Sequence, residues 1–288
     1  MTPRRLLFAA ALGVVLAALP GTAAGQSATT DDDFEPQRLQ PDFVLVNLPT
    51  TLRLPQYRLA FRVSHRFTKG VNEGGFTDAL SDAFGLDAGA QTGLELRFSP
   101  VRGAQVGVYR TSDKTVDFFG HYSVMQQGER WPVSITAIAA VEGTGNFTDV
   151  YSPSLGVSIA RTLGEVAAVY LVPMWINNTN PSPSELVESN DTFLLGIGAR
   201  VRLARGLYVV GEVSPRVSGF RGAFPRGATA LEEGTTVGSF AVEKQVGGHV
   251  FQVNFSNAFV TTRANIARGA APGATNWYLG FNISRKFY

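Results

Sequence analysis

The sequence contains no cysteine, and only 17% of its 288 residues are charged, where a soluble domain has about 25%. The absence of cysteine excludes a disulfide framework, a thiolate metal site and a catalytic thiol. Basic and acidic residues number 25 and 23, and they become equal when Arg4 and Arg5 are removed with the segment described next. A chain without excess charge is a poor match for nucleic acid, so we expect no nucleic-acid partner. Beyond residue 25, no apolar run approaches the length of about 18 residues that a transmembrane helix needs.

The first 25 residues have the pattern of a secretory signal peptide. A basic start at residues 1–5 is followed by an uncharged apolar stretch over 6–19 and by small residues over 22–25. As a helix, the apolar stretch covers about 21 Å, which is less than the ~30 Å hydrocarbon core of a bilayer. We therefore favour a cleaved signal peptide over a short membrane anchor, and we predict that the protein is exported.

An exported chain with little charge, 31 glycines and no further apolar helix fits an antiparallel β-barrel in the outer membrane of a Gram-negative bacterium. The segment 57–67, YRLAFRVSHRF, shows the required alternation, because one face is mostly apolar and the other carries Arg58, Arg62 and Arg66. In a soluble sandwich the apolar face would be the core, and in a barrel it would face lipid. This segment alone fits both architectures.

The repetition of the pattern favours the barrel. Alternation recurs in twelve segments, of which five are weaker matches, and both faces are apolar over 166–176, so its facing stays open. Long and short connections alternate along the chain, with 111–114 as the exception, as expected for external loops and periplasmic turns. We predict an all-β fold, an antiparallel transmembrane β-barrel of about 12 strands over residues 57–288. The segments are 57–67, 92–98, 104–110, 116–125, 133–142, 154–162, 165–176, 193–203, 206–215, 235–246, 251–259 and 277–287.

Several motifs resemble a family of bacterial outer-membrane β-barrel proteins that is classed as a domain of unknown function. The resemblance runs from about residue 41 to the C-terminus and is most specific in GGHVFQVNFSNA at 247–258 and WYLGFNISRKF at 277–287. Further matching motifs are VSHRF at 63–67, FGLDAG at 84–89, SDKTVDFFGHY at 112–122 and IARTL at 159–163. The resemblance implies a barrel in the outer membrane, and it transfers no substrate and no catalytic residue. The family usually ends on phenylalanine, whereas this chain adds Tyr288 after Phe287.

Two segments outside the strands have alternative interpretations. Residues 26–56 are acidic and proline-rich, and we predict a periplasmic N-terminal segment in which 43–48 either pairs briefly or fills the mouth of the barrel. In the first long loop, FTDALSDAF at 76–84 has the spacing of a short amphipathic helix. This helix would either cap the rim or fold inward as a constriction.

The polar faces of the alternating segments predict which side chains line the lumen. Charges enclosed there must pair or stay hydrated, so they form either a stiffening network or a field that favours anions, because arginines outnumber carboxylates. Twelve strands give a backbone diameter of ~24 Å and leave roughly 12 Å between side chains, enough for a small solute. The predicted lumen-lining residues are Arg58, Arg62, Arg66, Glu95, Arg97, Asp117, His121, Glu142, Arg200, Arg202, Glu212 and Lys286.

From these features we predict a narrow channel for the passive passage of small, anionic solutes. The alternative is a closed structural barrel that docks a partner through its external loops and transports nothing. The spacing of His65, His121 and His249 matches no metal site, and no nucleophile or phosphate-binding motif is present, so we expect no enzyme, metal or cofactor. The expected partners are outer-membrane lipid, a small solute, and the barrel-assembly machinery acting on the C-terminal strand.

Overall fold

The computed structural model describes residues 39–73, 89–128, 130–180, 190–220, 224–226, 230–273 and 275–287. The predicted signal peptide over 1–25 and the predicted helix over 76–84 lie outside these residues.

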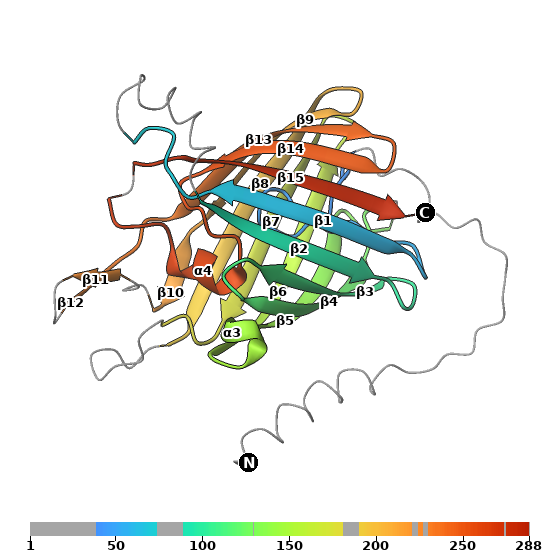
Figure 1. The fold of residues 1–288 in the computed structure, drawn as a ribbon. Helices are drawn as coiled ribbons and strands as arrows, with labels where there is room; N and C mark the ends of the chain where they lie inside the picture. Colours follow the sequence, from blue (N-terminus) through green and yellow to red (C-terminus); the bar gives the residue numbers. More distant parts are fainter. Residues whose placement is uncertain are drawn as a thin grey trace, which may run out of the picture. The chain divides into compact units, whose positions relative to one another are not determined.

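Twelve antiparallel strands form the wall of a closed barrel, which confirms the predicted fold class (Figure 1). The wall strands are β1 (Leu59–Phe67), β2 (Ala90–Phe98), β3 (Ala104–Thr111), β4 (Val116–Met125), β5 (Ser134–Gly143), β6 (Tyr151–Leu163), β7 (Ala167–Ile176), β8 (Thr192–Ala204), β9 (Leu207–Ser214), β13 (Val237–Val246), β14 (His249–Ser256) and β15 (Tyr278–Phe287). Each wall strand pairs with the next along the chain. The first and last strands also pair, with Val63 opposite Ile283, so the wall has no free edge.

Smaller elements lie in the connections between wall strands. They are α3 (Thr144–Phe147), β10 (Arg216–Gly219), β11 (Phe224–Arg226), β12 (Ala230–Glu232) and α4 (Arg263–Arg268). After β9 the chain continues into β10, which pairs with β8, and β11 pairs with β12 as a separate two-stranded sheet.

The connections sort by length between the two ends of the barrel. Turns 205–206 and 247–248 lie at one end, and α3, α4 and β10 lie at the other (Figure 1). The two-residue turns use Gly206 and Gly247 at φ of 67° and 56°, a backbone conformation that fits a tight hairpin and that glycine adopts without strain. The two glycines therefore specify the tight hairpin turns at this end of the barrel.

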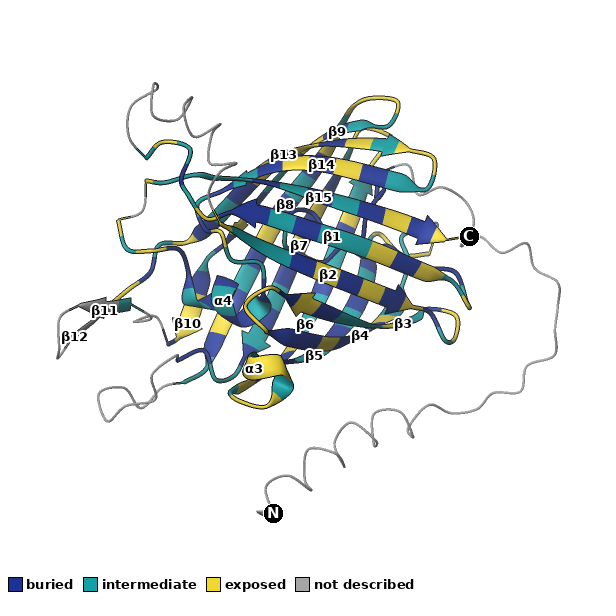
Figure 2. Cartoon of the chain, in the orientation of Figure 1, coloured by how far each residue is buried: buried dark blue, intermediate teal, exposed yellow. Residues whose placement is uncertain are grey.

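Side chains alternate between lipid and lumen along the wall strands, as the striped burial along β2 and β15 shows (Figure 2). In β14, the apolar Val253 is 53% exposed, while its polar neighbours Gln252 and Asn254 are buried. This pattern is the inverse of a soluble protein, in which apolar side chains are buried and polar ones are solvated. It is the pattern of a barrel whose outer surface lies in hydrocarbon.

The structure also settles how β7 faces. Its residues Tyr170, Val172 and Met174 are buried inside, whereas Val169 and Leu171 are exposed outside. The apolar inner face of β7 belongs to the main hydrophobic cluster of the molecule, which lies within the barrel. Both faces of β7 are therefore apolar because one meets lipid and the other meets an apolar filling.

Among the described residues, no helix combines the length and the apolar composition that crossing a bilayer requires.

The lipid-facing surface generates a stability prediction. We expect Val253→Arg to lower the free energy of unfolding by ~2–4 kcal/mol, because a guanidinium in the middle of the outer surface is removed from water. Val246→Arg is the matched control, since Val246 is also exposed but ends β13 beside a turn, where the expected loss is ~0–1 kcal/mol. Urea unfolding from phospholipid vesicles measures both. Equal losses for the two variants would contradict the assignment of this surface to lipid.

Candidate functional site

The N-terminal segment occupies the lumen. Residues 39–54, which we call the plug, are almost entirely buried, and Leu45 and Leu54 have no exposed surface. We predicted residues 26–56 as a periplasmic segment with 43–48 either pairing briefly or filling the mouth of the barrel. The structure places the described part of this segment against the inward-facing side chains of the wall.

The plug folds back on itself in a tight turn. The backbone N–H of Leu45 donates to the carbonyl of Leu48 at 2.8 Å, and that of Thr50 donates to the carbonyl of Phe43 at 2.9 Å. A bridge between Val44 and Pro49 completes this small hairpin. Residues 45–48 form its tip, and none of the described wall strands extends its ladder onto the plug.

Glu212 of β9 holds the tip. Its carboxylate accepts the backbone N–H groups of Val46, Asn47 and Leu48 at distances of 3.0–3.1 Å. The side-chain amide of Asn47 adds a further bond at 2.7 Å. Successive N–H groups that converge on one acceptor form a concave anion site, and here the anion belongs to the wall.

The carbonyls of the plug are bound by other wall strands. Backbone groups buried away from water need partners, and an extended segment outside the sheet takes them from side chains. Six wall side chains donate to six plug carbonyls, and these are Gln105 to Leu52, Ser158 to Pro49, Arg200 to Val44, Gln252 to Leu45, Asn282 to Val46 and Lys286 to Pro41.

Two inward-facing glycines of β8 make room for the tip. A Cβ atom on Gly196 would lie 2.5 Å from a methyl carbon of Leu48, and one on Gly198 would lie 2.3 Å from a methyl carbon of Leu45. The wall beside them is apolar, because Val172 and other inward residues of β5 to β9 form one cluster with Leu39, Leu45 and Leu48 of the plug. The plug therefore fits one half of the inner wall through complementary shape as well as through hydrogen bonds.

The connection between β14 and β15 also fills part of the lumen. Its helix α4 buries Ala264, Ile266 and Ala267. Glu142 of β5 fixes the start of this helix, since it accepts the hydroxyl of Thr262 at 2.9 Å and the N–H of Ala264 at 3.1 Å. From the sequence we considered an inward helix only at 76–84. Helix α4 was not identified, because its six residues are too few to show a helical period.

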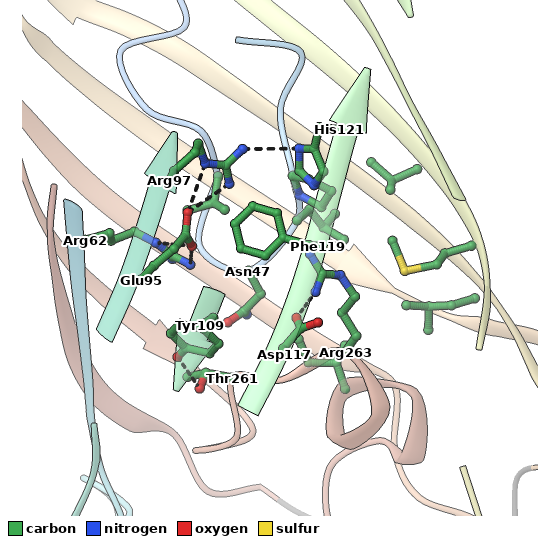
Figure 3. Close-up of a pocket in the computed structure, with 17 residues that line it drawn as sticks. Asn47, Arg62, Glu95, Arg97, Tyr109, Asp117, Phe119, His121, Thr261 and Arg263 are labelled. Carbon is green, nitrogen blue, oxygen red and sulfur yellow. Dashed lines mark hydrogen bonds and ion pairs between the residues drawn. The ribbon is translucent and has the colours of Figure 1, made fainter. Parts of the chain in front are cut away.

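A cavity of about 50 Å³ lies between the plug and α4 (Figure 3). This volume has room for about three or four water molecules. One part of its lining consists of titratable side chains from β1, β2, β4 and α4, which are Arg62, Glu95, Arg97, Asp117, His121 and Arg263.

Glu95 links two of the arginines at the cavity. Its carboxylate contacts Arg62 at 2.6 Å and Arg97 at 2.8 Å. The Arg97 guanidinium stacks over the rings of Phe43 and Phe119, at 4.6 and 4.7 Å from their centroids. These contacts fix Arg97 between the plug and the wall.

Arg97 also determines the state of His121. One of its N–H groups lies 3.2 Å from the Nδ1 atom of His121, which must then accept, so the imidazole is neutral and carries its proton on Nε2. Across the cavity, Arg263 forms an ion pair with Asp117. Burial lowers the pKa of the Arg263 guanidinium to about 10, which leaves it protonated at neutral pH.

The structure brings five predicted lumen residues together at the cavity and spreads the others through the lumen. Those at the cavity are Arg62, Glu95, Arg97, Asp117 and His121. Those that are buried elsewhere are Arg66, Glu142, Arg200, Glu212 and Lys286. Arg58 precedes β1 and Arg202 lies near the end of β8, and both are partly exposed.

Sequence reasoning missed several residues that the structure places at these sites. Arg263 lies in a connection, where no alternation assigns a facing. Glu243 faces inward in β13 and forms a buried ion pair with Arg200, with bonds of 2.7 and 3.0 Å. Ser239, Ala241 and Glu243 occupy alternate positions of β13, and this alternation could have placed Glu243 on the inner face.

Comparison with known proteins finds one family. A model described as "Membrane bound beta barrel domain (DUF5777)" matches residues 42–287. No curated protein sequence matches this chain.

Several solved structures are similar to this chain, and the first of the three described next shares its fold. The COG4313 outer membrane channel from Pseudomonas putida F1 has a TM-score of 0.51 at 13% identity, and the match covers 82% of this chain and 97% of that one. The NanC porin has a TM-score of 0.49 at 9% identity, with 80% and 99% covered. Omp33 of Acinetobacter baumannii has a TM-score of 0.40 at 11% identity, with 81% and 99% covered.

The buried ion pair in the lumen generates a second prediction. Arg200→Leu leaves the Glu243 carboxylate enclosed without its cation, so we expect the free energy of unfolding to fall by ~3–5 kcal/mol. The double variant Arg200→Leu/Glu243→Leu should regain most of this loss, because it leaves no unpaired charge.

Arg202→Leu is the control for this prediction. Arg202 lies on the same strand, and its side chain is 25% exposed and 3.5 Å from Glu165, so its removal should cost at most ~1 kcal/mol. Urea unfolding of the folded barrel measures all three variants. A loss for Arg200→Leu no larger than that for Arg202→Leu would refute the role assigned to the buried pair.

Proposed function

This chain belongs to the membrane bound beta barrel domain family (DUF5777), and from that premise we propose that it forms a narrow channel for small anionic solutes, with the plug as its gate. The protein is an outer-membrane β-barrel whose outer surface contacts lipid. The proposal adds a pathway through the lumen and a preference for negative charge.

The observation that carries the proposal is the charge around the central cavity. Three guanidinium groups line it, from Arg62, Arg97 and Arg263, against the two carboxylates of Glu95 and Asp117. The buried carboxylate of Asp42 in the plug also acts on Arg62 and Arg97, so one positive charge would become uncompensated when the plug moves away. Rings of basic side chains at a constriction favour the entry of anions.

Movement of the plug would open the pathway. In the conformation described here, the plug and α4 fill the lumen around the cavity. The tip is held by side-chain bonds rather than by strand pairing, and hydrogen bonds contribute about 1 kcal/mol each in net terms, somewhat more where one group is charged. A segment bound in this way can detach while the barrel wall stays intact. The four N–H groups that converge on Glu212 make this residue the main latch.

The second candidate is a permanently closed barrel that binds a partner through its external loops. The filling of the lumen by both the plug and α4 favours it. Neither candidate requires a catalytic residue, and conduction separates the two.

Planar-bilayer recording of a disulfide-locked variant tests the proposal. Since the chain has no cysteine, Leu48→Cys/Gly196→Cys creates a single thiol pair that joins the tip of the plug to β8. Adding Glu212→Gln weakens the latch, and we expect anion-selective openings roughly tenfold more frequent than in the wild type when the pair is reduced. Oxidation of the pair should abolish these openings.

The controls for this recording use the same lipid and salt. Glu212→Gln without cysteines should conduct equally under oxidising and reducing conditions, and Arg263→Gln should lower the preference for anions. Silence of the reduced triple variant and of Glu212→Gln, with folded protein shown in the bilayer, would reject the channel in favour of the closed barrel.

A further inference from the structure

Two basic side chains lie on the lipid-facing side of the wall at one end of the barrel. This end carries the turns 205–206 and 247–248, and we call it the short-turn end (Figure 1). Lys244 of β13 and Arg285 of β15 are both exposed, and each is two residues from the end of its strand. Their neighbours on the same face are apolar, and these are Val242, Val246, Ile283 and Phe287. A charge in such a surface is costly unless it reaches the polar boundary of the membrane.

Contacts of the two side chains direct their charged groups toward that boundary. The ammonium of Lys244 donates to the carbonyl of Arg205, in the turn between β8 and β9, at 3.3 Å. Nη1 of Arg285 donates to Nε2 of His249, the first residue of β14, at 3.1 Å. The Arg285 guanidinium also lies over the ring of Phe287, 5.1 Å from its centroid. Long basic side chains that extend in this way place their charge at the level of the lipid headgroups.

These residues belong to one continuous surface. Strands β13, β14 and β15 are neighbours in the sheet, with Val246 opposite His249 and His249 opposite Arg285. Lys244 is therefore two strands away from Arg285, which is ~10 Å across the sheet. We call the surface formed by Arg205, Lys244 and Arg285 the basic patch.

The wall around the basic patch offers no carboxylate to neutralise it. Within strands β9, β13, β14, β15 and β1, the acidic residues are Glu212 and Glu243. Both are buried inside the barrel, where Glu212 binds the plug and Glu243 binds Arg200. Tyr288, which carries the terminal carboxylate, lies outside the described residues, and the test below includes a variant that moves this charge.

We propose that the basic patch binds the headgroup of an anionic phospholipid in the membrane leaflet at the short-turn end. The phosphodiester binds toward Arg285 and Lys244, and the acyl chains lie along the apolar outer surface of β13 to β15. A guanidinium offers paired N–H groups that match two phosphate oxygens, and Arg285 uses only Nη1 for His249. Each basic residue near an anionic surface strengthens binding about fivefold. The inference does not depend on conduction through the lumen.

Native mass spectrometry of the full chain, folded in detergent, tests the inference with phosphatidylglycerol and phosphatidylethanolamine at equal concentrations. Both lipids carry a phosphate, but only phosphatidylglycerol has a net negative charge. We expect phosphatidylglycerol to bind at least fivefold more tightly. Lys244→Gln/Arg285→Gln should bind the two lipids equally, and Lys244→Arg should keep the preference.

The double variant Arg110→Gln/Lys114→Gln is the matched control. It removes the same charge from exposed residues at the opposite end of the barrel, where Asp113 and Asp149 lie in the same connections, so the preference should remain. A variant with two glycines added after Tyr288 moves the terminal carboxylate and should also keep the preference. Heat-modifiable migration on gels shows that each variant is folded.

Four outcomes would overturn the inference. The first is equal binding of both lipids by the wild type, or equal losses in the two double variants. The second is a preference that appears only in the extended variant, which would assign Arg285 to the terminal carboxylate. The third is glycerol phosphate that binds as tightly as phosphatidylglycerol, because this molecule has no acyl chains. The fourth is displacement of the lipid by a peptide of residues 26–38, which would assign the patch to the acidic segment that contains Asp31, Asp32, Asp33 and Glu35.

Discussion

Hydrocarbon offers no hydrogen bonds, and this constraint shapes the whole protein. Every backbone N–H and C=O in the wall must find its partner in a neighbouring strand, so the sheet has to close on itself. Closure occurs where β1 meets β15, far apart in sequence. Once the wall is closed, its outer side chains must be apolar, and the polar ones are left to fill an enclosed space.

That enclosed space creates a second requirement, because charges inside it cannot rely on bulk water. The protein meets it by pairing them, as in Arg200 with Glu243, or by binding them to the backbone of the plug, as in Glu212. The plug is thus a partner for the wall and an obstacle to any solute. The cavity between the plug and α4 is lined by three arginines and two carboxylates. Under the proposed function, a channel and a filled barrel are two states of the same interior.

The alternation of side chains explains why the sequence predicted the wall so well. Facing in a strand depends only on odd or even position, and segments such as 57–67 and 277–287 show it directly. The facing of β7 stayed open because its inner side is apolar too, and the packing of the plug and α4 inside the barrel explains that. The inward glycines Gly196 and Gly198 make room for the plug, but a sequence cannot say what approaches a glycine. The ion pair of Arg263 with Asp117 joins a loop to a distant strand, and no local pattern encodes such a contact.

The central claim is that the plug sits in the lumen on a latch made by Glu212 and leaves when the latch weakens. The most direct test is the rate at which a single cysteine at the tip, Leu45→Cys, reacts with a membrane-impermeant maleimide in folded protein. The account predicts slow labelling when Glu212 is intact and labelling about tenfold faster with Glu212→Gln. Fast labelling in both backgrounds, or an equal rate in both, would contradict it.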